Sequence, residues 1–309
     1  METGSTREYA GKKILELGAT EPNLCVVGAD LNKSTFTNLF AAKYPDRFFD
    51  VGIAEQNMVN IAAGLASSGK IPIVSTFAVF GSTRPMDQLR VGVAQSNLNV
   101  KVILTHAGLI TGEDGISAQS LEDISLFLSL HSFSVLVPSD AYEAQAAVEL
   151  AVNTNGPFYV RLSRPAIPII NNEDIKLKHG GSNIMVEGSD ISILAYGYMV
   201  HHAIEASKIL KEKHGISAKV VNMYSLRPID SEMILNCASK SRFILTVEEH
   251  FKYGGLHSLV SQIVTQNNPV KVHSVAMNNY AESGTTDELV KKYGLDSQSI
   301  VEKVLANLN

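Results

Sequence analysis

The stretch Asp50-Val51-Gly52-Ile53-Ala54-Glu55-Gln56-Asn57-Met58 decides the fold that we expect for this chain. The apolar residues 48–51 predict the end of a short strand, the glycine predicts a turn, and the residues after it predict a helix. Glu55 then lies in the first helical turn, near unpaired N–H groups and beyond the strand ends where open α/β sheets bind ligands. Acidic residues are common in any first turn, so Glu55 alone is better explained as a partner of the helix dipole than as a catalyst.

Size and composition indicate a folded protein of about two domains. The chain has 309 residues, of which 45% are hydrophobic and 18% are charged. The formal net charge is −5 and the basic residues form no stripe, so we expect no nucleic-acid partner. No apolar run has the length of a signal-peptide core or a membrane span, which predicts a cytoplasmic protein without a membrane partner. Cys25 and Cys237 make no disulfide framework and no metal site.

Apolar strands alternate with amphipathic helices along the whole chain, and this alternation predicts parallel α/β sheets with helices on both faces. The pattern breaks at Pro165 and Pro168, which precede a polar stretch. We therefore expect two doubly wound domains. The first is a parallel-sheet domain at 1–170, and a linker at 171–184 leads to a smaller mixed or parallel-sheet domain at 185–309.

Polar and aromatic side chains gather directly after the expected strands of the first domain. These candidates are Asp30, Ser34, Phe77, Phe80, His106 and Asp114. Loops after parallel strands often bind ligands, and two phenyl rings can stack on a flat heterocycle, although turns and core packing explain the same residues. We expect the glycine-rich loop 105–115 to be flexible and polar, and it has no metal-ligand spacing. We interpret the second-domain cluster 248–250 as structural.

Several motifs in a fixed order resemble the C-terminal half of transketolase, as found in split two-subunit transketolases. The motifs are Gly52-Ile53-Ala54-Glu55-Gln56-Asn57-Met58, Ser75-Thr76-Phe77 with Phe80, Thr105-His106-Ala107-Gly108 with Gly112-Glu113-Asp114-Gly115, Val137-Pro138-Ser139-Asp140, and Leu162-Ser163-Arg164-Pro165. Each motif is weak alone, but their shared order is specific. The resemblance covers essentially the whole chain and implies a pyrimidine-binding domain followed by a transketolase C-terminal domain.

The resemblance implies a thiamine-diphosphate enzyme that transfers a two-carbon ketol unit between ketose and aldose phosphates. Glu55 matches the acid that hydrogen-bonds a ring nitrogen of the cofactor's aminopyrimidine and so activates the cofactor. Phe80, and more loosely Phe77, match the surface on which that ring stacks. Asp30 matches a polar residue on the cofactor side. A family tyrosine that lines this pocket is not matched, because Thr83 stands about there.

The sugar-phosphate contacts of the family fall on four residues of this chain, which are Arg7, Ser34, His106 and Arg164. Guanidinium, hydroxyl and imidazole groups suit a phosphate dianion, and a sulfonate would fit comparably. Asp114 matches the family residue that hydrogen-bonds a substrate hydroxyl.

Two departures from the family pattern change these expectations. Ala118 stands where the family has a histidine, which implies an unusual ketose or a role taken over by another histidine. The Gly-Asp-Gly run and downstream Asn that hold Mg²⁺ and the diphosphate are absent from this sequence. The resemblance therefore implies an N-terminal transketolase subunit as partner, which supplies that half of the site in an α2β2 heterotetramer, and no metal ligand in this chain.

Other hypotheses stay open at this point. A deoxyxylulose-phosphate synthase-like activity or the β-subunit of a 2-oxo-acid dehydrogenase would use similar domains, although the phosphate-binding set argues against the latter. Ala118 also leaves open a non-catalytic subunit that only scaffolds or regulates a partner. The ketose donor and the aldose acceptor, including branched or sulfonated sugars, are not specified by the sequence.

Overall fold

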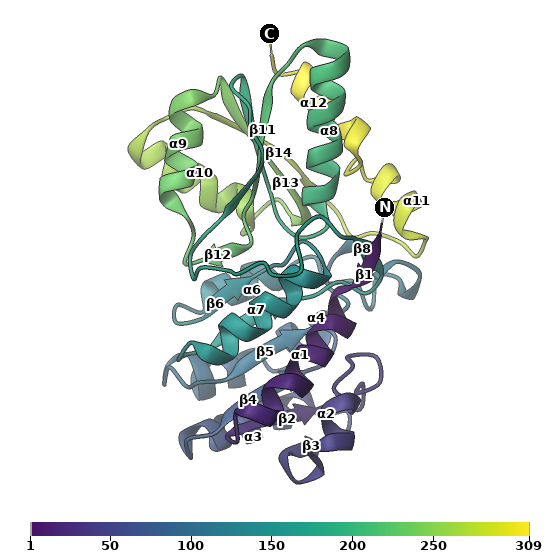
Figure 1. Cartoon of the computed structure of the whole chain (residues 1–309), viewed down its shortest axis with the longest axis vertical. Coiled ribbons are helices and arrows are strands. Elements are labelled where there is room, and N and C mark those ends of the chain that lie inside the picture. The colour runs from purple at the N-terminus through teal and green to yellow at the C-terminus, as the bar shows by residue number, and fades with distance from the viewer. Residues whose placement is uncertain (1, 309) are drawn as a thin grey trace.

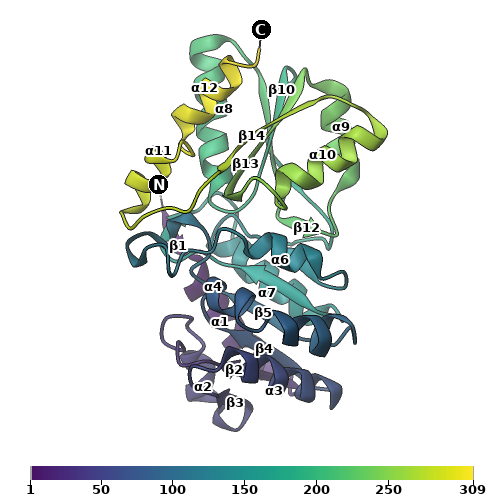
Figure 2. The ribbon, with the colours of Figure 1, turned by 180° about the vertical axis from the view of Figure 1, so that it is seen from behind.

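Two twisted sheets, one beyond the other along the long axis, organise the computed structural model, which describes residues 2–308 (Figures 1 and 2). The seven-stranded sheet has the order β12-β6-β7-β5-β4-β2-β3, and the five-stranded sheet has the order β14-β13-β10-β11-β9. Both sheets are mostly parallel and carry helices on both faces. The expected α/β class with two sheets is therefore confirmed.

The seven-stranded sheet consists of β2 (Leu24–Gly28), β3 (Phe48–Asp50), β4 (Ile71–Ser75), β5 (Lys101–Leu104), β6 (Ser134–Leu136), β7 (Phe158–Arg161) and β12 (Ser225–Arg227). Strands β2 to β7 pair in parallel. All residues of β2, β5, β6 and β7 are buried, because helices cover both faces of a parallel sheet. This is why these strands are short apolar runs without alternation.

Helices on the two faces of this sheet build two different cores. On one face, Ala10 and Ile14 of α1 (Thr6–Thr20) pack with Ala144 and Val148 of α7. On the other face, Met58, Val59 and Ala62 of α3 join the main core. The remaining bounds are α2 (Asn38–Lys43), α3 (Glu55–Ser67), α4 (Ala78–Thr83), α5 (Met86–Gln88), a π-helical segment η2 (Leu89–Ala94), α6 (Asp123–Ser129) and α7 (Ala141–Asn153).

The second sheet follows after the linker and is flanked by α9 and α10 on one side and by α8 and α12 on the other. Its strands are β9 (Asn183–Val186), β10 (Ile191–Ala195), β11 (Ala218–Asn222), β13 (Phe243–Phe251) and β14 (Lys271–Met277). Its helices are α8 (Met199–His214), α9 (Ser231–Lys240), α10 (Leu256–Asn267), α11 (Thr286–Lys292) and α12 (Ser297–Leu305). Within residues 2–308, none of the helices has the length and apolar character needed to span a bilayer.

Three pairs of strands are antiparallel. Strand β9 runs antiparallel to β11, and β1 (Thr3–Ser5) pairs antiparallel with β8 (Ala166–Pro168). Strand β12 leaves the second part of the chain and pairs antiparallel with β6, with Ser225 opposite Leu136. The second part thus completes the sheet of the first, and the exact domain boundaries stay a prediction.

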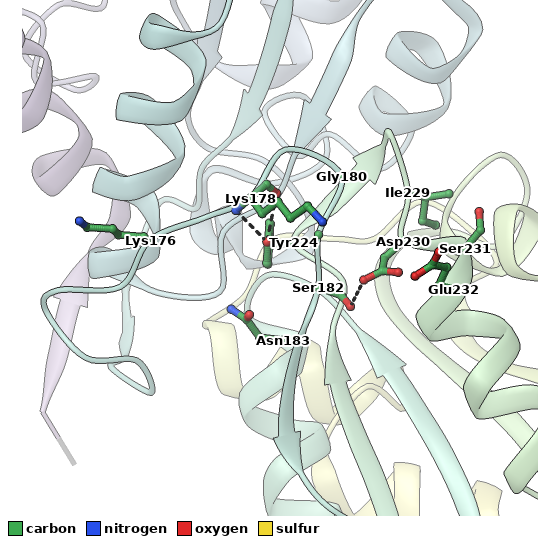
Figure 3. A pocket seen from close by; sticks show the side chains of 11 residues that line it. Lys176, Lys178, Gly180, Ser182, Asn183, Tyr224, Ile229, Asp230, Ser231 and Glu232 are labelled. Carbon is green, nitrogen blue, oxygen red and sulfur yellow. Dashed lines mark hydrogen bonds between the residues drawn. The ribbon is translucent and has the colours of Figure 1, made fainter.

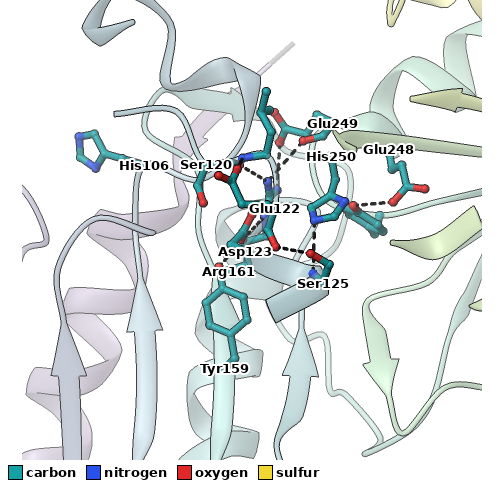
Figure 4. A network of polar contacts seen from close by, with 12 residues as sticks. His106, Ser120, Glu122, Asp123, Ser125, Tyr159, Arg161, Glu248, Glu249 and His250 are labelled. Carbon is teal, nitrogen blue, oxygen red and sulfur yellow. Dashed lines mark hydrogen bonds and ion pairs between the residues drawn. The ribbon is translucent and has the colours of Figure 1, made fainter. Parts of the chain in front are cut away.

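A buried polar network joins the two parts of the molecule (Figure 4). The Arg161 guanidinium lies 2.7 Å from Asp123 Oδ2 of its own domain and 3.4 Å from Glu249 Oε1 of β13. Tyr159 donates a hydrogen bond to the same Asp123 oxygen. Because these charges are almost fully buried, each requires its partner, and the network fixes how the two sheets are oriented. The structural interpretation of residues 248–250 agrees with this burial.

Candidate active site

The candidate residues converge at one edge of the seven-stranded sheet, where its parallel strands end. Ser34 follows β2, Glu55 follows β3, Phe77 follows β4, His106 follows β5 and Arg164 follows β7. Carboxyl ends of parallel strands lie at the same edge, so residues far apart in the sequence come together there. Arg7 joins them from the first turn of α1.

Glu55 is the first residue of α3, and its side chain is only 4% exposed. The preceding Ala54 offers no side-chain cap, so the carboxylate lies at the positive end of a helix whose first N–H groups have no capping side chain. Its Oε1 accepts a hydrogen bond from Nη1 of Arg84 at 2.7 Å. The buried acid is therefore charge-paired within the chain.

A row of stacked groups leads away from Glu55. The Arg84 guanidinium carbon lies 4.1 Å from the centre of the Phe80 ring. Phe80 is nearly parallel to Phe77, with ring centres 5.8 Å apart and planes at 14°. Phe77 in turn stacks on the His106 imidazole, with centres 3.6 Å apart and planes at 18°. The row connects the carboxylate to the imidazole through flat groups only.

His106 is held in an unusual backbone conformation at the end of this row. Its φ of 58° lies in the left-handed region, which disfavours residues with a Cβ and is frequent at functional sites. Its Nδ1 lies 2.8 Å from the Thr105 hydroxyl. Burial, together with the positive charges of Arg7 and Arg164, lowers the pKa of His106 to about 3. The imidazole is therefore neutral near pH 7.

Two arginines lie beyond His106. Arg7 Nε donates to the Arg164 carbonyl at 2.9 Å, and its Nη1 donates to the Ser34 carbonyl at 2.7 Å. The Arg164 guanidinium lies 3.2 Å from Asp114 and 3.7 Å from Glu113. Burial and the charge of Arg164 lower the pKa of Arg7. The structure thus brings the five predicted substrate residues together, with Ser34 contributing its carbonyl to the contact.

The charges around Arg164 are balanced. The positive charges of Arg7 and Arg164 face the negative charges of Glu113 and Asp114. An anion that binds here competes with these two carboxylates for the N–H donors of the Arg164 guanidinium. The exposed Glu113 is the easier of the two to displace, because its distance to Arg164 is longer.

The loop that follows β5 is anchored rather than flexible, which corrects the expectation for residues 105–115. Leu109 and Ile110 are fully buried in the core of the second domain. The Ile110 N–H donates to Glu249 Oε2 at 3.2 Å, and the Thr111 hydroxyl donates to the His106 carbonyl at 2.6 Å. Within this segment, η3 (Leu109–Asp114) consists of two short 3₁₀ turns separated by a kink at Gly112. The second domain thereby positions Asp114.

Asp30 and Ala118 lie outside the row and the arginine cluster. Asp30 is exposed, with φ of 59°, and its N–H donates to Asp50 Oδ1 at 3.1 Å. The Asp50 carboxylate also accepts from the Gly52 N–H at 3.1 Å, so it braces the loops after β2 and β3. Ala118 is buried just beyond η3. The structure places no contact between Asp30 and Glu55.

Arg84 and Glu113 were missed as site residues by sequence reasoning. Arg84 follows Phe80 by four residues at the end of α4, a spacing that puts two side chains on one helix face. That spacing was the available signal for Arg84. Glu113 belongs to the motif Gly112-Glu113-Asp114-Gly115, but only the fold shows its approach to Arg164.

The pocket shown in Figure 3 does not coincide with this site. A pocket of about 480 Å³ lies where the linker meets the second domain (Figure 3). Its polar groups bond one another: Ser182 donates to Asp230 at 2.8 Å, and Tyr224 bonds the Lys178 backbone. A smaller pocket of about 300 Å³ adjoins Arg164 and is lined by both domains. Among residues 2–308, no three His, Cys, Asp or Glu side chains are arranged to hold a metal ion.

Together, the fold and this edge site define a two-domain α/β protein with an acid-and-aromatic row beyond its strand ends. The chain belongs to the transketolase family. Residues 2–169 match the family model "Transketolase, pyrimidine binding domain", and residues 180–300 match "Transketolase, C-terminal domain".

Known proteins similar to this chain include both half-length and full-length transketolases. A protein of Methanocaldococcus jannaschii described as a transketolase C-terminal section is 41% identical, over 98% of this chain and 96% of its own length. One of the subunits of an apulose-4-phosphate transketolase from Phocaeicola vulgatus is 35% identical over 94% of each chain. Human "Transketolase" is 37% identical, but this chain spans only 48% of it. A solved structure titled "Split gene transketolase, inactive beta4 tetramer" has a TM-score of 0.92 at 41% identity, covering 98% of each chain.

Proposed function

We propose that this chain is the C-terminal subunit of a thiamine-diphosphate-dependent transketolase. With an N-terminal partner subunit, it transfers a two-carbon ketol unit between ketose and aldose phosphates. The observation that carries this proposal is Glu55, a buried carboxylate at the start of α3 beside a row of aromatic rings. Relatives of matching length described as a transketolase section or subunit support the division into two chains.

The residues of this site fit the aminopyrimidine of the cofactor. Such a ring needs an acid at a ring nitrogen and a flat surface for stacking, which Glu55 and Phe80 offer. The Arg84 guanidinium already makes these two contacts, so the site accepts a planar group with N–H donors. Phe77 extends the surface. Asp30 has the least structural support as a cofactor-side residue, because it lies in a turn braced by Asp50.

When bound, thiamine diphosphate supplies the carbon nucleophile for ketol transfer. Glu55 holds a proton at the ring nitrogen, and its place in a largely buried site strengthens that hydrogen bond. The aromatic row excludes water from one side of the site. Neutral His106 bonds a substrate oxygen, and Asp114 accepts from a substrate hydroxyl. Arg7 and Arg164, with Ser34 nearby, anchor the terminal phosphate.

The partner subunit holds the diphosphate and Mg²⁺ in this proposal. The support is the sequence, which has no Gly-Asp-Gly run, and the length of the chain, which spans about half of the mammalian transketolases. We propose an α2β2 assembly in the cytoplasm. The proposed divisions of the chain are a pyrimidine-binding domain at 1–170, a linker at 171–184 and a C-terminal domain at 185–309.

The test combines the purified chain with its N-terminal partner, thiamine diphosphate and Mg²⁺, and measures ketol transfer between sugar phosphates. We expect Glu55→Ala to lower kcat by about 10²–10⁴-fold, the range for a group that moves a proton. Glu302→Ala is the matched control, since Glu302 is an exposed acid on α12 of the second domain that accepts a hydrogen bond from Gln298. Unchanged turnover of Glu55→Ala would refute the proposal, and full activity without the partner would refute the split site.

Ala118 supports a second candidate, a non-catalytic subunit that scaffolds or regulates its partner. Ala118 is 8% exposed and has no group that bonds a substrate. In that case the two chains would form a complex, but no ketose or pyruvate donor would turn over, and Glu55→Ala would leave cofactor affinity unchanged. Condensation of pyruvate with an aldose phosphate would instead indicate the synthase-like activity.

A further inference from the structure

Arg84 contacts both groups that the proposed function assigns to the cofactor ring. Its Nη1 lies 2.7 Å from Glu55 Oε1, and its guanidinium carbon lies 4.1 Å from the centre of the Phe80 ring. A guanidinium is planar, delocalised and rich in N–H donors, so it bonds carboxylates and stacks on aromatic faces. An aminopyrimidine that carries a proton on its ring has the same properties.

We infer that Arg84 is a built-in competitor for the aminopyrimidine, which it imitates at Glu55 and Phe80 until the cofactor displaces it. This inference rests on the proposed function. Because one side chain makes both contacts, a ring that binds Glu55 and stacks on the same face of Phe80 has to displace Arg84 from both. Cofactor binding then requires the guanidinium to swing out.

The surroundings of Arg84 allow this swing. The Arg84 side chain is 44% exposed, whereas Glu55 is 4% exposed, so the arginine is the partner that is free to leave. The Arg84 backbone is held separately, because its carbonyl accepts from Gln56 Nε2 at 3.3 Å. A change of rotamer is therefore sufficient, and α4 stays in place.

The pair also explains how the chain tolerates a buried acid before assembly. A buried carboxylate without a partner is strongly unfavourable, and Arg84 supplies that partner. The cofactor ring supplies it in the loaded complex. Glu55 thus exchanges one planar donor for another.

The experiment measures thiamine diphosphate affinity by calorimetry in the assembled two-chain complex with Mg²⁺. Molecules in which Arg84 occupies Glu55 and Phe80 cannot bind the cofactor ring, so the apparent affinity falls in proportion to the fraction in which Arg84 has swung out. We therefore expect the Arg84→Gln complex to bind thiamine diphosphate roughly fivefold tighter or more. Arg90→Gln is the matched control, because Arg90 is exposed on the neighbouring segment η2 and should leave affinity unchanged. Equal or weaker binding by Arg84→Gln would overturn the inference, since it would mean that Arg84 assists the ring.

A second measurement uses the isolated chain and needs no turnover. Arg84→Gln should lower the urea midpoint of this chain, and the loss should be smaller in a Glu55→Gln background, because the neutral amide needs no cation. An equal fall in the urea midpoint with Glu55 intact and in the Glu55→Gln background would show that Arg84 does not stabilise the Glu55 carboxylate. The Glu55→Ala complex separates the two proposals: if it binds cofactor normally, the proposed function fails. If Glu55→Ala weakens cofactor binding but Arg84→Gln does not strengthen it, only the inference that Arg84 competes with the ring fails.

Discussion

The Arg161 guanidinium lies 3.4 Å from the Glu249 carboxylate, and this ion pair joins the seven-stranded sheet to the second domain. Both side chains are 2–3% exposed. Burial raises the pKa of Glu249 to about 7, and the positive charge of Arg161 opposes that rise. The same arginine pairs with Asp123, so one cation compensates two buried acids.

Replacing Arg161 by Met should lower the free energy of unfolding by about 3–5 kcal/mol, because Asp123 and Glu249 lose their common partner. Lys12→Ala removes an exposed pair with Glu8 and should cost less than about 1 kcal/mol. Urea unfolding measures both variants. A loss below about 1 kcal/mol for Arg161→Met would show that the network does not fix the domain orientation.

The low pKa of His106 has a measurable consequence for stability. Its folded value of about 3 lies below the ordinary 6.5, so between these values the folded chain binds fewer protons than the unfolded chain. The stability that the neutral His106 contributes to the folded chain is complete above pH 6.5. It is lost as the pH falls toward 3, by about 1.4 kcal/mol per pH unit. His106→Gln should flatten this part of the stability profile. In NMR titrations, the His106 imidazole resonances should not shift between about pH 5 and 8.

Replacement by alanine should have opposite effects on stability at two glycines, Gly108 and Gly64. Gly108 has φ of 80°, and an added Cβ would lie 2.3 Å from Glu249 Oε2, so Gly108→Ala should destabilise the chain strongly. Gly64 lies in α3, with nothing within 4 Å of an added Cβ. Gly64→Ala should stabilise the isolated chain by about 0.5–1 kcal/mol. Thermal unfolding compares the two, and a stabilising Gly108→Ala would contradict the described loop geometry.

Arg164→Lys should raise KM for a phosphorylated ketose about tenfold or more and change kcat little, because a lysine cannot replace a guanidinium that faces two acceptors. The measurement is the steady-state ketol transfer of the two-chain complex. Arg242→Lys provides the control at an exposed arginine of the second domain. An equal rise in KM for the unphosphorylated sugar would show that Arg164 does not bind the phosphate.

Sequence patterns predicted the elements whose stability is local and apolar, and these are confirmed. The strand end expected at 48–51 is β3 (Phe48–Asp50), and the helix expected after the glycine turn is α3, which begins at Glu55. The short strand β12 was missed, since three residues carry no periodicity and their pairing depends on the docking of the other domain. The π-helical segment η2 (Leu89–Ala94) after α5 was likewise not predicted.

The candidate site was predictable as a set of residues but not as a set of contacts. Motif order identified Glu55 and Arg164, whose roles stay predictions. The sequence did not show that Arg84 pairs with Glu55, because a side-chain contact between separate elements leaves no periodic signal. Glycine content suggested mobility at 105–115, whereas the burial of Leu109 and Ile110 in the core of the other domain anchors the segment.

Strand β12 has a consequence for anyone who truncates this protein. A fragment that ends in the linker would lack Ser225–Arg227 and would expose the backbone donors and acceptors of β6 along a free sheet border. Unprotected borders of this kind recruit strands from other molecules and lead to aggregates. Recombinant work on the first half therefore calls for retaining β12 or supplying it as a peptide.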